Sequence, residues 1–234
     1  MFTQKFQAWV RRWAERGIGV FRDSPITPNM LTLFGLAITG FGAALVAMGH
    51  LVLGGIVLLF AGLFDILDGA LARAAGKVYR YGAFLDSTVD RYSEGIVYLG
   101  ILIYFLQGHD TLDSVVVLIA LAGSFLVSYV RARAQSLGFS CDVGILARPE
   151  RVVIIVAGLI LEPIRALPVP ALTIALWILA VGTNFTAVQR VWAVWQQNRV
   201  ELAALRGQAR VQQPVGAQPV RAAMRRFFEN LGKT

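Results

Sequence analysis

The chain contains little cysteine and little histidine, and each shortage excludes a class of site. One cysteine, Cys141, rules out a disulfide within the chain and offers no pair of thiolates to a metal. The two histidines, His50 and His109, stand alone in expected loops. A zinc site or a histidine-based catalytic centre therefore has little support in the sequence. No glycine-rich dinucleotide-binding motif and no solenoid repeat is found.

Charged residues are also scarce, at 15% of 234 residues, whereas 56% are hydrophobic and the mean hydropathy is +0.62. This composition is too apolar for an ordinary soluble domain of this length. The net charge of +8 and the pI of about 10.2 raise the question of nucleic-acid binding. The basic residues, however, cluster at the ends of apolar runs, where they would face anionic lipid head groups. We therefore expect membrane lipids as partners, and no nucleic acid.

Long apolar runs recur along the chain. We expect them to form six transmembrane helices, at residues 28–48, 51–73, 82–106, 114–134, 148–164 and 170–195. Each run is near the roughly 20 residues that a bilayer requires. Abundant glycine in the first two runs fits close packing of membrane helices. The expected fold class is an all-α integral membrane protein.

The two ends of the chain differ from this membrane domain, which we place at residues 24–199. Residues 1–23 interleave aromatic and basic side chains and lack the apolar core and cleavage site of a signal peptide. They are typical of an amphipathic helix lying at the membrane interface. Residues 200–234 are rich in Gln, Ala and Arg, which predicts a basic, loosely ordered tail.

The distribution of Lys and Arg predicts the orientation in the membrane. The N-terminal segment, the 73–82 loop, the 131–151 loop and the tail all carry basic residues. Of the alternate loops, only the one near 163–168 carries any, and it has Arg165 alone. By the positive-inside rule, both termini lie in the cytoplasm, and the chain is a multi-pass protein of the cell membrane.

Two pairs of acidic residues lie where one apolar run ends and the next begins. Asp65 and Asp68 are three residues apart, and Asp86 and Asp90 are four apart, so each pair projects from one face of its helix. Ionisable groups at such positions are costly in a bilayer and indicate a functional site. Four carboxylates packed together repel one another unless a cation lies among them, and hard divalent cations such as Mg²⁺ prefer oxygen ligands.

The stretch from Asp65 to Asp90 resembles the signature of the CDP-alcohol phosphotransferase family: D-x-x-D-G-x-x-A-R, eight residues, then G-x-x-x-D-x-x-x-D. The resemblance extends over about residues 27–195. It implies an enzyme that uses CDP-diacylglycerol, in which Asp65, Asp68, Asp86 and Asp90 hold two ions of Mg²⁺, or of Mn²⁺. Asp90 would also be the catalytic base. The positions that match CDP-diacylglycerol-binding positions of the family are Asn29, Thr32, Gly69, Ala72, Arg73, Tyr79 and Gly82.

A second group of residues resembles the phosphatidylinositol-phosphate synthases of actinobacteria, whose acceptor is inositol 1-phosphate. The matching positions, which the resemblance assigns to the acceptor phosphate, are Ser128, Arg131, Arg133, Arg151 and Arg190. Guanidinium groups suit this role because they pair bidentately with phosphate. Because Arg190 lies inside the last apolar run, we expect it to have an anionic partner. Three positions depart from the subgroup, which often has lysine at Arg131, glutamate at Ala147 and aspartate at Asn29.

Two alternatives stay open at this stage. Another acceptor, such as glycerol 3-phosphate, would give phosphatidylglycerophosphate by the same reaction. A cation carrier lined by the four acids is a different class, but it requires acids near mid-membrane with access from both sides, whereas these cluster toward one end. The resemblance also implies a homodimer. The sequence does not separate Mg²⁺ from Mn²⁺.

Overall fold

The computed structural model describes residues 28–74, 80–164 and 168–211, and the side chains of residues 29–65, 80–164 and 168–205 within them. Its elements are the helices α2 (Pro28–Ala47), α3 (Leu51–Ala74), α4 (Arg80–Gln107), α5 (Thr111–Ser136), α6 (Arg148–Leu161) and α7 (Ala171–Val211). No strand occurs over these ranges, which confirms the expected all-α class. The expected interfacial helix at 1–23 lies outside the described residues.

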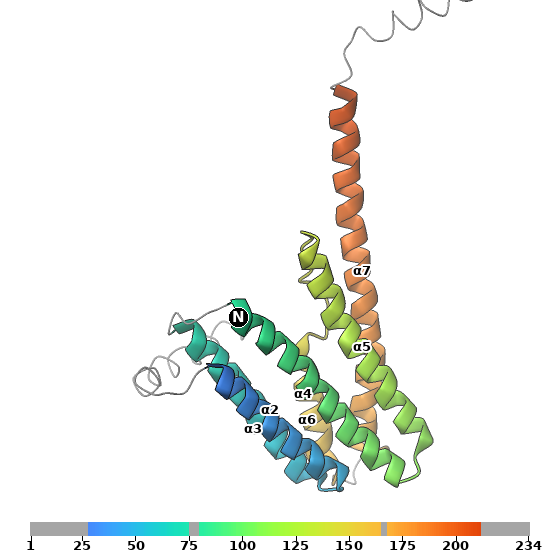
Figure 1. The fold of residues 1–234 in the computed structure, drawn as a ribbon. Helices are drawn as coiled ribbons and strands as arrows, with labels where there is room; N and C mark the ends of the chain where they lie inside the picture. The colour runs from blue at the N-terminus through green and yellow to red at the C-terminus, as the bar shows by residue number, and fades with distance from the viewer. Residues whose placement is uncertain (1–27, 75–79, 165–167, 212–234) are drawn as a thin grey trace, which may run out of the picture.

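Two tight turns reverse the chain between neighbouring helices. After α2, Gly49 adopts a φ of +85°, and the backbone N–H groups of Gly49 and His50 donate to carbonyls of the last turn of α2 at 2.9 Å. Glycine adopts this left-handed conformation at little cost. Before α5, the Asp110 carboxylate accepts a hydrogen bond from the Asp113 N–H at 3.0 Å and caps the helix. Both turns lie at the same end of the molecule (Figure 1).

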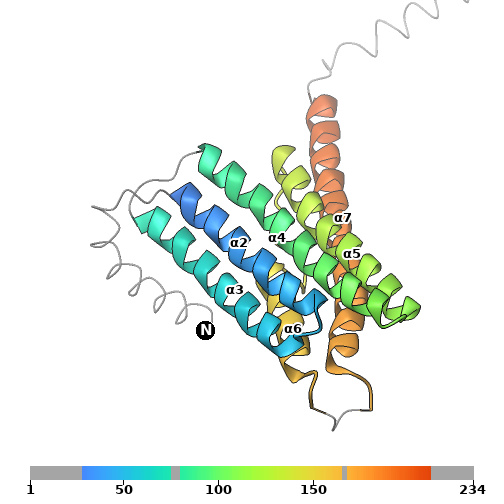
Figure 2. The same ribbon diagram turned by 60° about the horizontal axis from the view of Figure 1, so that its bottom comes forward.

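The helices pack in two groups. Helix α2 packs against α3 and α4, whereas α5 packs along α7 (Figure 2). Helix α6 contacts both α3 and α7 and so joins the two groups, and α4 contacts α5. The core between them is apolar and includes Tyr98, Ile101, Val117, Leu159, Leu172 and Leu176. The open ends of α2 to α6 lie opposite the tight turns (Figure 1). The predicted acids belong to the parts of α3 and α4 that are nearer to these open ends.

Small residues allow the helices to approach closely. A methyl group at Gly100 of α4 would overlap the backbone of Ala43 in α2. A methyl group at Gly123 of α5 would overlap Thr183 of α7. Such contacts are typical of membrane helices, where packing replaces the hydrophobic effect between apolar surfaces. Many large apolar side chains elsewhere face outward, such as Phe41 and Phe60, which are 60% and 63% exposed.

Three described helices are long and apolar enough to cross a membrane: Asn29–Ala47, Thr111–Ser136 and Ala171–Leu205. The other expected spans also form helices, with boundaries within three residues of those expected. The opening turns of α4 are charged. Helix α3 has 24 residues, and its described side chains form the apolar segment Leu51–Asp65. Helix α6 has 14 residues, about 21 Å long, less than the roughly 30 Å of a hydrocarbon core.

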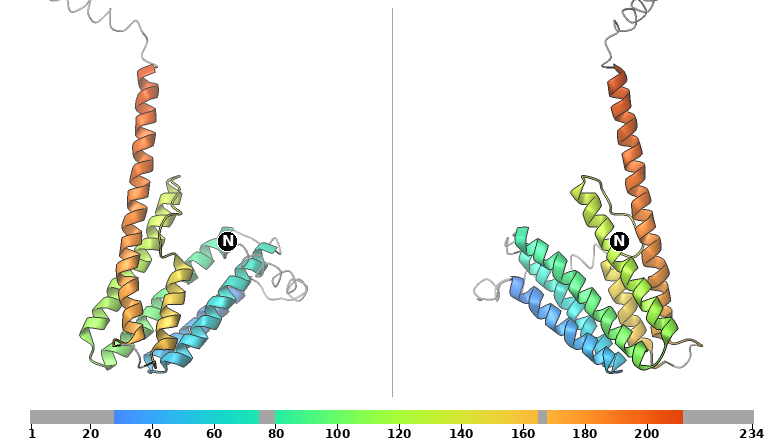
Figure 3. Two further views of the ribbon diagram at one scale, coloured as in Figure 1. Left: turned by 180° about the vertical axis from the view of Figure 1, so that it is seen from behind. Right: turned by 45° about the vertical axis from the view of Figure 1, so that its right-hand side comes forward.

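Helix α7 departs most from expectation. It has 41 residues and extends well beyond the other helices (Figure 3). The sixth run was expected to end near residue 195 and a loosely ordered tail to begin at residue 200, but the helix continues to Val211. The Ala-, Leu- and Arg-rich residues after Trp195 favour helix, so the loss of hydropathy marks the end of the apolar run and not the end of the helix. The rest of the expected tail, 212–234, lies outside the described residues.

Candidate functional site

Three of the four predicted acids come together at the open end of the bundle. Asp65 projects from α3, and Asp86 and Asp90 project from successive turns of α4. One carboxylate oxygen from each lies within 4.8 Å of the others. The backbone of Asp68 lies on α3, but its side chain is outside the described residues.

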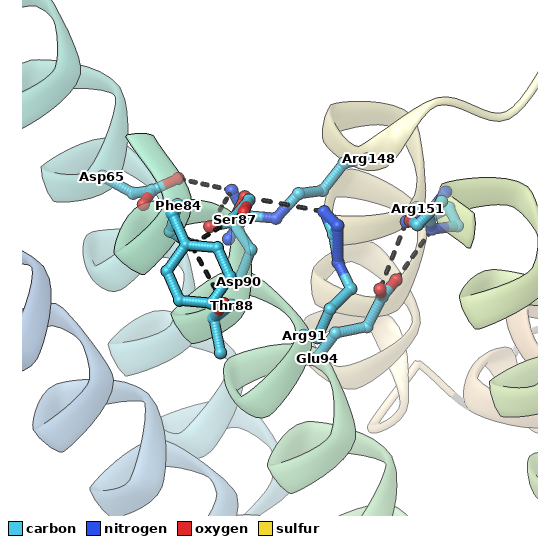
Figure 4. A network of polar contacts seen from close by, with 10 residues as sticks. Asp65, Phe84, Ser87, Thr88, Asp90, Arg91, Glu94, Arg148 and Arg151 are labelled. Atoms are coloured by element: carbon cyan, nitrogen blue, oxygen red, sulfur yellow. Dashed lines mark hydrogen bonds and ion pairs between the residues drawn. The ribbon is translucent and has the colours of Figure 1, made fainter. Parts of the chain in front are cut away.

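Arg148 lies directly against this acid cluster, which comprises Asp65, Asp86 and Asp90. Its Nη1 atom is 2.7 Å from Asp65 Oδ2 and 2.7 Å from Asp90 Oδ1 (Figure 4). Arg91 is farther away, with its Nη2 atom 3.8 Å from Asp90 Oδ2. Arg148 begins α6, so its backbone is fixed by that helix. Arg148 belongs to the basic 131–151 loop expected from the sequence, but it was not among the predicted site residues.

The donor set fits a divalent cation. The three carboxylates supply only oxygen ligands, which hard ions such as Mg²⁺ and Mn²⁺ accept. Their separation is small enough for one ion to contact more than one of them. The cluster would hold such an ion through Asp65, Asp86 and Asp90.

A buried ion pair lies one helical turn farther along α4. Arg151 Nε is 2.8 Å from Glu94 Oε1, and Arg151 Nη2 is 3.2 Å from Glu94 Oε2, which is a bidentate pair (Figure 4). The two side chains are 1% and 7% exposed. Arg151 also donates to the Leu146 carbonyl at 3.2 Å and to the Ser128 hydroxyl at 3.4 Å. Glu94 was missed, although its spacing of four residues from Asp90 places it on the same face of α4.

The other predicted acceptor residues make different contacts. Arg190 is buried, and it donates to the backbone carbonyls of Val143, at 2.9 Å, and Val127. Its described hydrogen bonds therefore go to backbone carbonyls, and an anionic partner for Arg190 stays a prediction. Val143 lies in the loop after α5, whereas Val127 lies inside α5, so Arg190 contacts one loop carbonyl and one helix carbonyl.

Arg131 and Arg133 are exposed on the last turns of α5. Arg131 Nη2 is 2.8 Å from Asp142 Oδ1, and Arg133 donates to Ser136 of its own helix at 3.5 Å. The structure thus brings Ser128 and Arg151 into contact, and loop residues 142–143 connect Arg131 with Arg190. Arg133 makes no described contact with the others.

The residues expected to bind CDP-diacylglycerol are only partly described. Thr32 lines a pocket between α2, α3, α4 and α6, together with Asp65, Glu94, Arg148 and Arg151. Its deeper wall is apolar and includes Leu36, Leu58, Val97 and Ile155. Gly82 faces Asn29 across α2 and α4, since a Cβ at Gly82 would lie 3.7 Å from Asn29 Oδ1. Tyr79, and the side chains at positions 69, 72 and 73, lie outside the described residues.

Comparison with known proteins gives the same family as the acid spacing. The family model for CDP-alcohol phosphatidyltransferase matches residues 25–198. A protein named phosphatidylinositol phosphate synthase from Mycobacterium marinum is 43% identical over 174 residues, which cover 73% of this chain and 74% of the relative. A protein of the same name from Mycobacterium tuberculosis is 40% identical, over 73% and 80% of the two chains.

Solved structures of that Mycobacterium tuberculosis enzyme are also similar. One, with CDP-DAG bound, has a TM-score of 0.70 and 37% identity, and covers 80% of this chain and 93% of that one. Another, in complex with manganese and citrate, has a TM-score of 0.69 and 38% identity, over 80% and 88%. From the matched length, the identity and the shared fold, the chain belongs to the CDP-alcohol phosphatidyltransferase family and is a membrane enzyme.

Proposed function

We propose that this enzyme transfers the phosphatidyl group of CDP-diacylglycerol to the hydroxyl of inositol 1-phosphate, giving phosphatidylinositol phosphate and CMP. The names of the similar mycobacterial proteins support this acceptor. The mycobacterial structure with CDP-DAG bound supports the donor. The proposal concerns residues 24–199, which form the membrane domain in this scheme.

The acceptor assignment rests on one observation, the group of arginines beside the acid cluster. Arg151 and Arg190 are 1% and 3% exposed, and both are placed by contacts with loop residues 143–146. Buried guanidinium groups are costly unless they serve an anion or are fully hydrogen-bonded. Arg131 is paired with the exposed Asp142, a surface contact that a phosphate dianion replaces at little cost. We assign the acceptor phosphate to Ser128, Arg131, Arg151 and Arg190, with Arg133 at the rim.

The acid cluster supplies the reacting end. We assign the metal ligands to Asp65, Asp68, Asp86 and Asp90, with two ions of Mg²⁺, or of Mn²⁺ as in the mycobacterial structure with manganese. When bound, divalent ions neutralise the charge of the pyrophosphate. Asp90 takes the proton of the acceptor hydroxyl, whose oxygen forms a bond to the lipid-side phosphorus. The bond from that phosphorus to the CMP oxygen breaks, and CMP leaves with the electron pair.

The donor, CDP-diacylglycerol, lies along the opening turns of α2, the end of α3 and the start of α4, which meet at the acid cluster. We assign the nucleotide to Asn29, Thr32, Gly69, Ala72, Arg73, Tyr79 and Gly82. Two observations support this assignment: Gly82 faces Asn29, and Thr32 lines the pocket. The small residues at 69, 72 and 82 leave room for the nucleotide close to the backbone.

In the membrane, the proposed enzyme has six transmembrane helices, an interfacial helix at 1–23 and a basic tail that continues from α7. Both termini and the acid cluster face the cytoplasm of a cell membrane, and two copies form a homodimer. The charged opening turns of α4 and the shortness of α6 fit helices that end at the head-group region around the cluster. A carrier is disfavoured because Asp65, Asp86 and Asp90 lie together on the parts of α3 and α4 farther from the tight turns.

The deciding experiment is CMP release from CDP-diacylglycerol by the purified full-length enzyme with a panel of acceptors. Inositol 1-phosphate should support turnover, whereas glycerol 3-phosphate and free inositol should not. Chelation should abolish release, and Mg²⁺ or Mn²⁺ should restore it. Preference for glycerol 3-phosphate would refute the acceptor and leave the family unchanged, whereas full activity in chelator would refute the metal site.

A variant of the basic group tests the same proposal. Arg190→Gln should raise the KM for inositol 1-phosphate and leave the KM for CDP-diacylglycerol nearly unchanged. Arg199→Gln is the matched control, because Arg199 lies over the Trp195 ring on the part of α7 beyond the site, 4.9 Å from the ring centroid. Equal changes in both KM values would count against the acceptor role.

A further inference from the structure

Arg148 has none of the roles assigned above. A single atom, Nη1, lies 2.7 Å from Asp65 Oδ2 and 2.7 Å from Asp90 Oδ1. It therefore bridges carboxylates that belong to α3 and α4, with a side chain that belongs to α6 (Figure 4). Such a bridge offsets the repulsion between the two acids.

This nitrogen occupies the space that an ion shared by Asp65 and Asp90 would take. Divalent ions bind carboxylate oxygens at about 2.0–2.6 Å, and both oxygens here lie at only slightly greater distance from Nη1. A cation at that point and a guanidinium nitrogen cannot coexist, because their separation would fall far below any allowed contact.

The backbone of Arg148 is held, but its side chain has room to move. Arg148 is followed by Pro149 at the start of α6, and the same first turns are anchored by the buried Arg151 with Glu94. The Arg148 side chain keeps 29% of its surface exposed. A long side chain on a fixed backbone and open to one side can leave the cluster without any rearrangement of the helices.

We propose that Arg148 is a displaceable counter-ion of the acid cluster. It partly compensates the charges of Asp65 and Asp90 when they hold no divalent ion, keeps α3 and α4 together there, and swings out when an ion binds. Arg148 therefore competes with the metal and sets its affinity. The role is one of positioning, and it rests on the metal site of the proposed function.

The test measures metal binding directly. The purified full-length protein is stripped with chelator, exchanged into chelator-free buffer and titrated with Mn²⁺ while free Mn²⁺ is followed by electron paramagnetic resonance. Arg148→Gln should bind Mn²⁺ about tenfold more tightly or better, since its competitor is gone. Arg91→Gln is the matched control: it removes the same charge from a guanidinium whose Nη2 is 3.8 Å from Asp90 and bridges no pair. Its affinity should change by less than about threefold.

Thermal denaturation supplies an independent readout. In chelator, Arg148→Gln should unfold at a lower temperature than the parent protein, because Asp65 and Asp90 then repel each other unopposed. Saturating Mn²⁺ should remove most of that difference. If Arg148→Gln fails to fold, Arg148→Lys keeps the charge but not the planar fork, and should still bind Mn²⁺ several-fold more tightly than the parent.

Three results would overturn the proposal: unchanged or weaker Mn²⁺ binding in the folded Arg148 variant, equal tightening in Arg91→Gln, or a stability loss that Mn²⁺ does not reduce. A parent protein without saturable Mn²⁺ binding would refute the metal site itself, and this role with it. The identity of the acceptor does not enter the measurement, so the two proposals fail separately.

Discussion

At the scale of single residues, Asp90 meets two requirements with one carboxylate. It pairs with Arg148 through Oδ1, and it belongs to the group that could hold an ion with Asp65 and Asp86. Its side chain is 13% exposed, so it is largely enclosed and still partly accessible. A base needs this combination of partial burial and access, because it must be held in place and still meet the proton that it accepts.

Replacing Asp90 by asparagine separates these roles. Asp90→Asn keeps the shape but loses the proton acceptor, so turnover should fall by about 10²–10⁴-fold. CDP-diacylglycerol binding, measured at equilibrium on the purified variant, should stay within several-fold of the parent. Asp65→Asn should instead weaken binding of both metal and nucleotide. An Asp90→Asn protein that binds donor as poorly as Asp65→Asn would leave the base role without separate support.

Glu94 and Arg151 make a second prediction at this scale. Both are buried, so removing one partner leaves a charge without compensation, at a cost of about 3–5 kcal/mol. Glu94→Gln and Arg151→Gln should each lower the thermal unfolding midpoint clearly. The double variant should lose less than the sum of the two single losses, because no lone buried charge remains. Additive losses in a denaturation series would show that the two side chains act independently.

At the scale of elements, helix α4 and the loop after α5 connect the acid cluster with the basic residues. Asp86, Asp90 and Glu94 follow one another at intervals of four residues along α4. The loop supplies Asp142 to Arg131, the Val143 carbonyl to Arg190 and the Leu146 carbonyl to Arg151. Since the same loop leads directly into Arg148, its position affects both groups of charges.

The α5–α7 contact gives a prediction at the element scale. Gly123→Ala should lower the unfolding midpoint, because the added methyl overlaps Thr183, which is itself fixed by a 2.7 Å hydrogen bond to the Leu179 carbonyl. Gly40→Ala in α2 is the matched control, since nothing lies within 4 Å of a Cβ there. Thermal denaturation of both variants in one detergent checks this. If Gly40→Ala lowers the unfolding midpoint as much, the loss comes from replacing a glycine and not from the contact between α5 and α7.

At the scale of the whole molecule, the two ends of the bundle differ in chemistry. The tight turns after α2 and α4 lie at one end, and the acid cluster with Arg148 and Arg151 lies at the other (Figure 1). Helix α7 extends past the bundle at the charged end (Figure 3). The proposed reaction fits this asymmetry, because the charged head group of the lipid donor and the charged acceptor do not enter the hydrocarbon layer.

The orientation is testable by cysteine labelling. Cys141 is 1% exposed and is the single cysteine of the chain, so Cys141→Ala provides a background without thiols. In intact cells, a membrane-impermeant maleimide should label Gln107→Cys, at the end of α4. Gln135→Cys, exposed at the end of α5, should react only after permeabilisation. The reverse pattern would place the acid cluster outside the cell.

The sequence by itself determined the class of the fold and the place of the acids. Apolar runs of membrane length predict the helices because helix formation depends on neighbouring residues. The spacing of Asp65, Asp86 and Asp90 pointed to the family, because a spacing along the chain can also be read from the sequence alone. The end of α7 was not predicted, because loss of hydropathy does not end a helix whose residues favour helix.

Only the tertiary structure decided which charges pair. Arg148 and Asp65 are separated by 83 residues, and Arg151 and Glu94 by 57, so no local pattern links them. Arg190 donates to the carbonyls of Val143 and Val127, 47 and 63 residues away, and no sequence pattern reveals such backbone acceptors. Pairing of buried charges depends on how the helices pack in three dimensions, and that packing brings a guanidinium into the acid cluster.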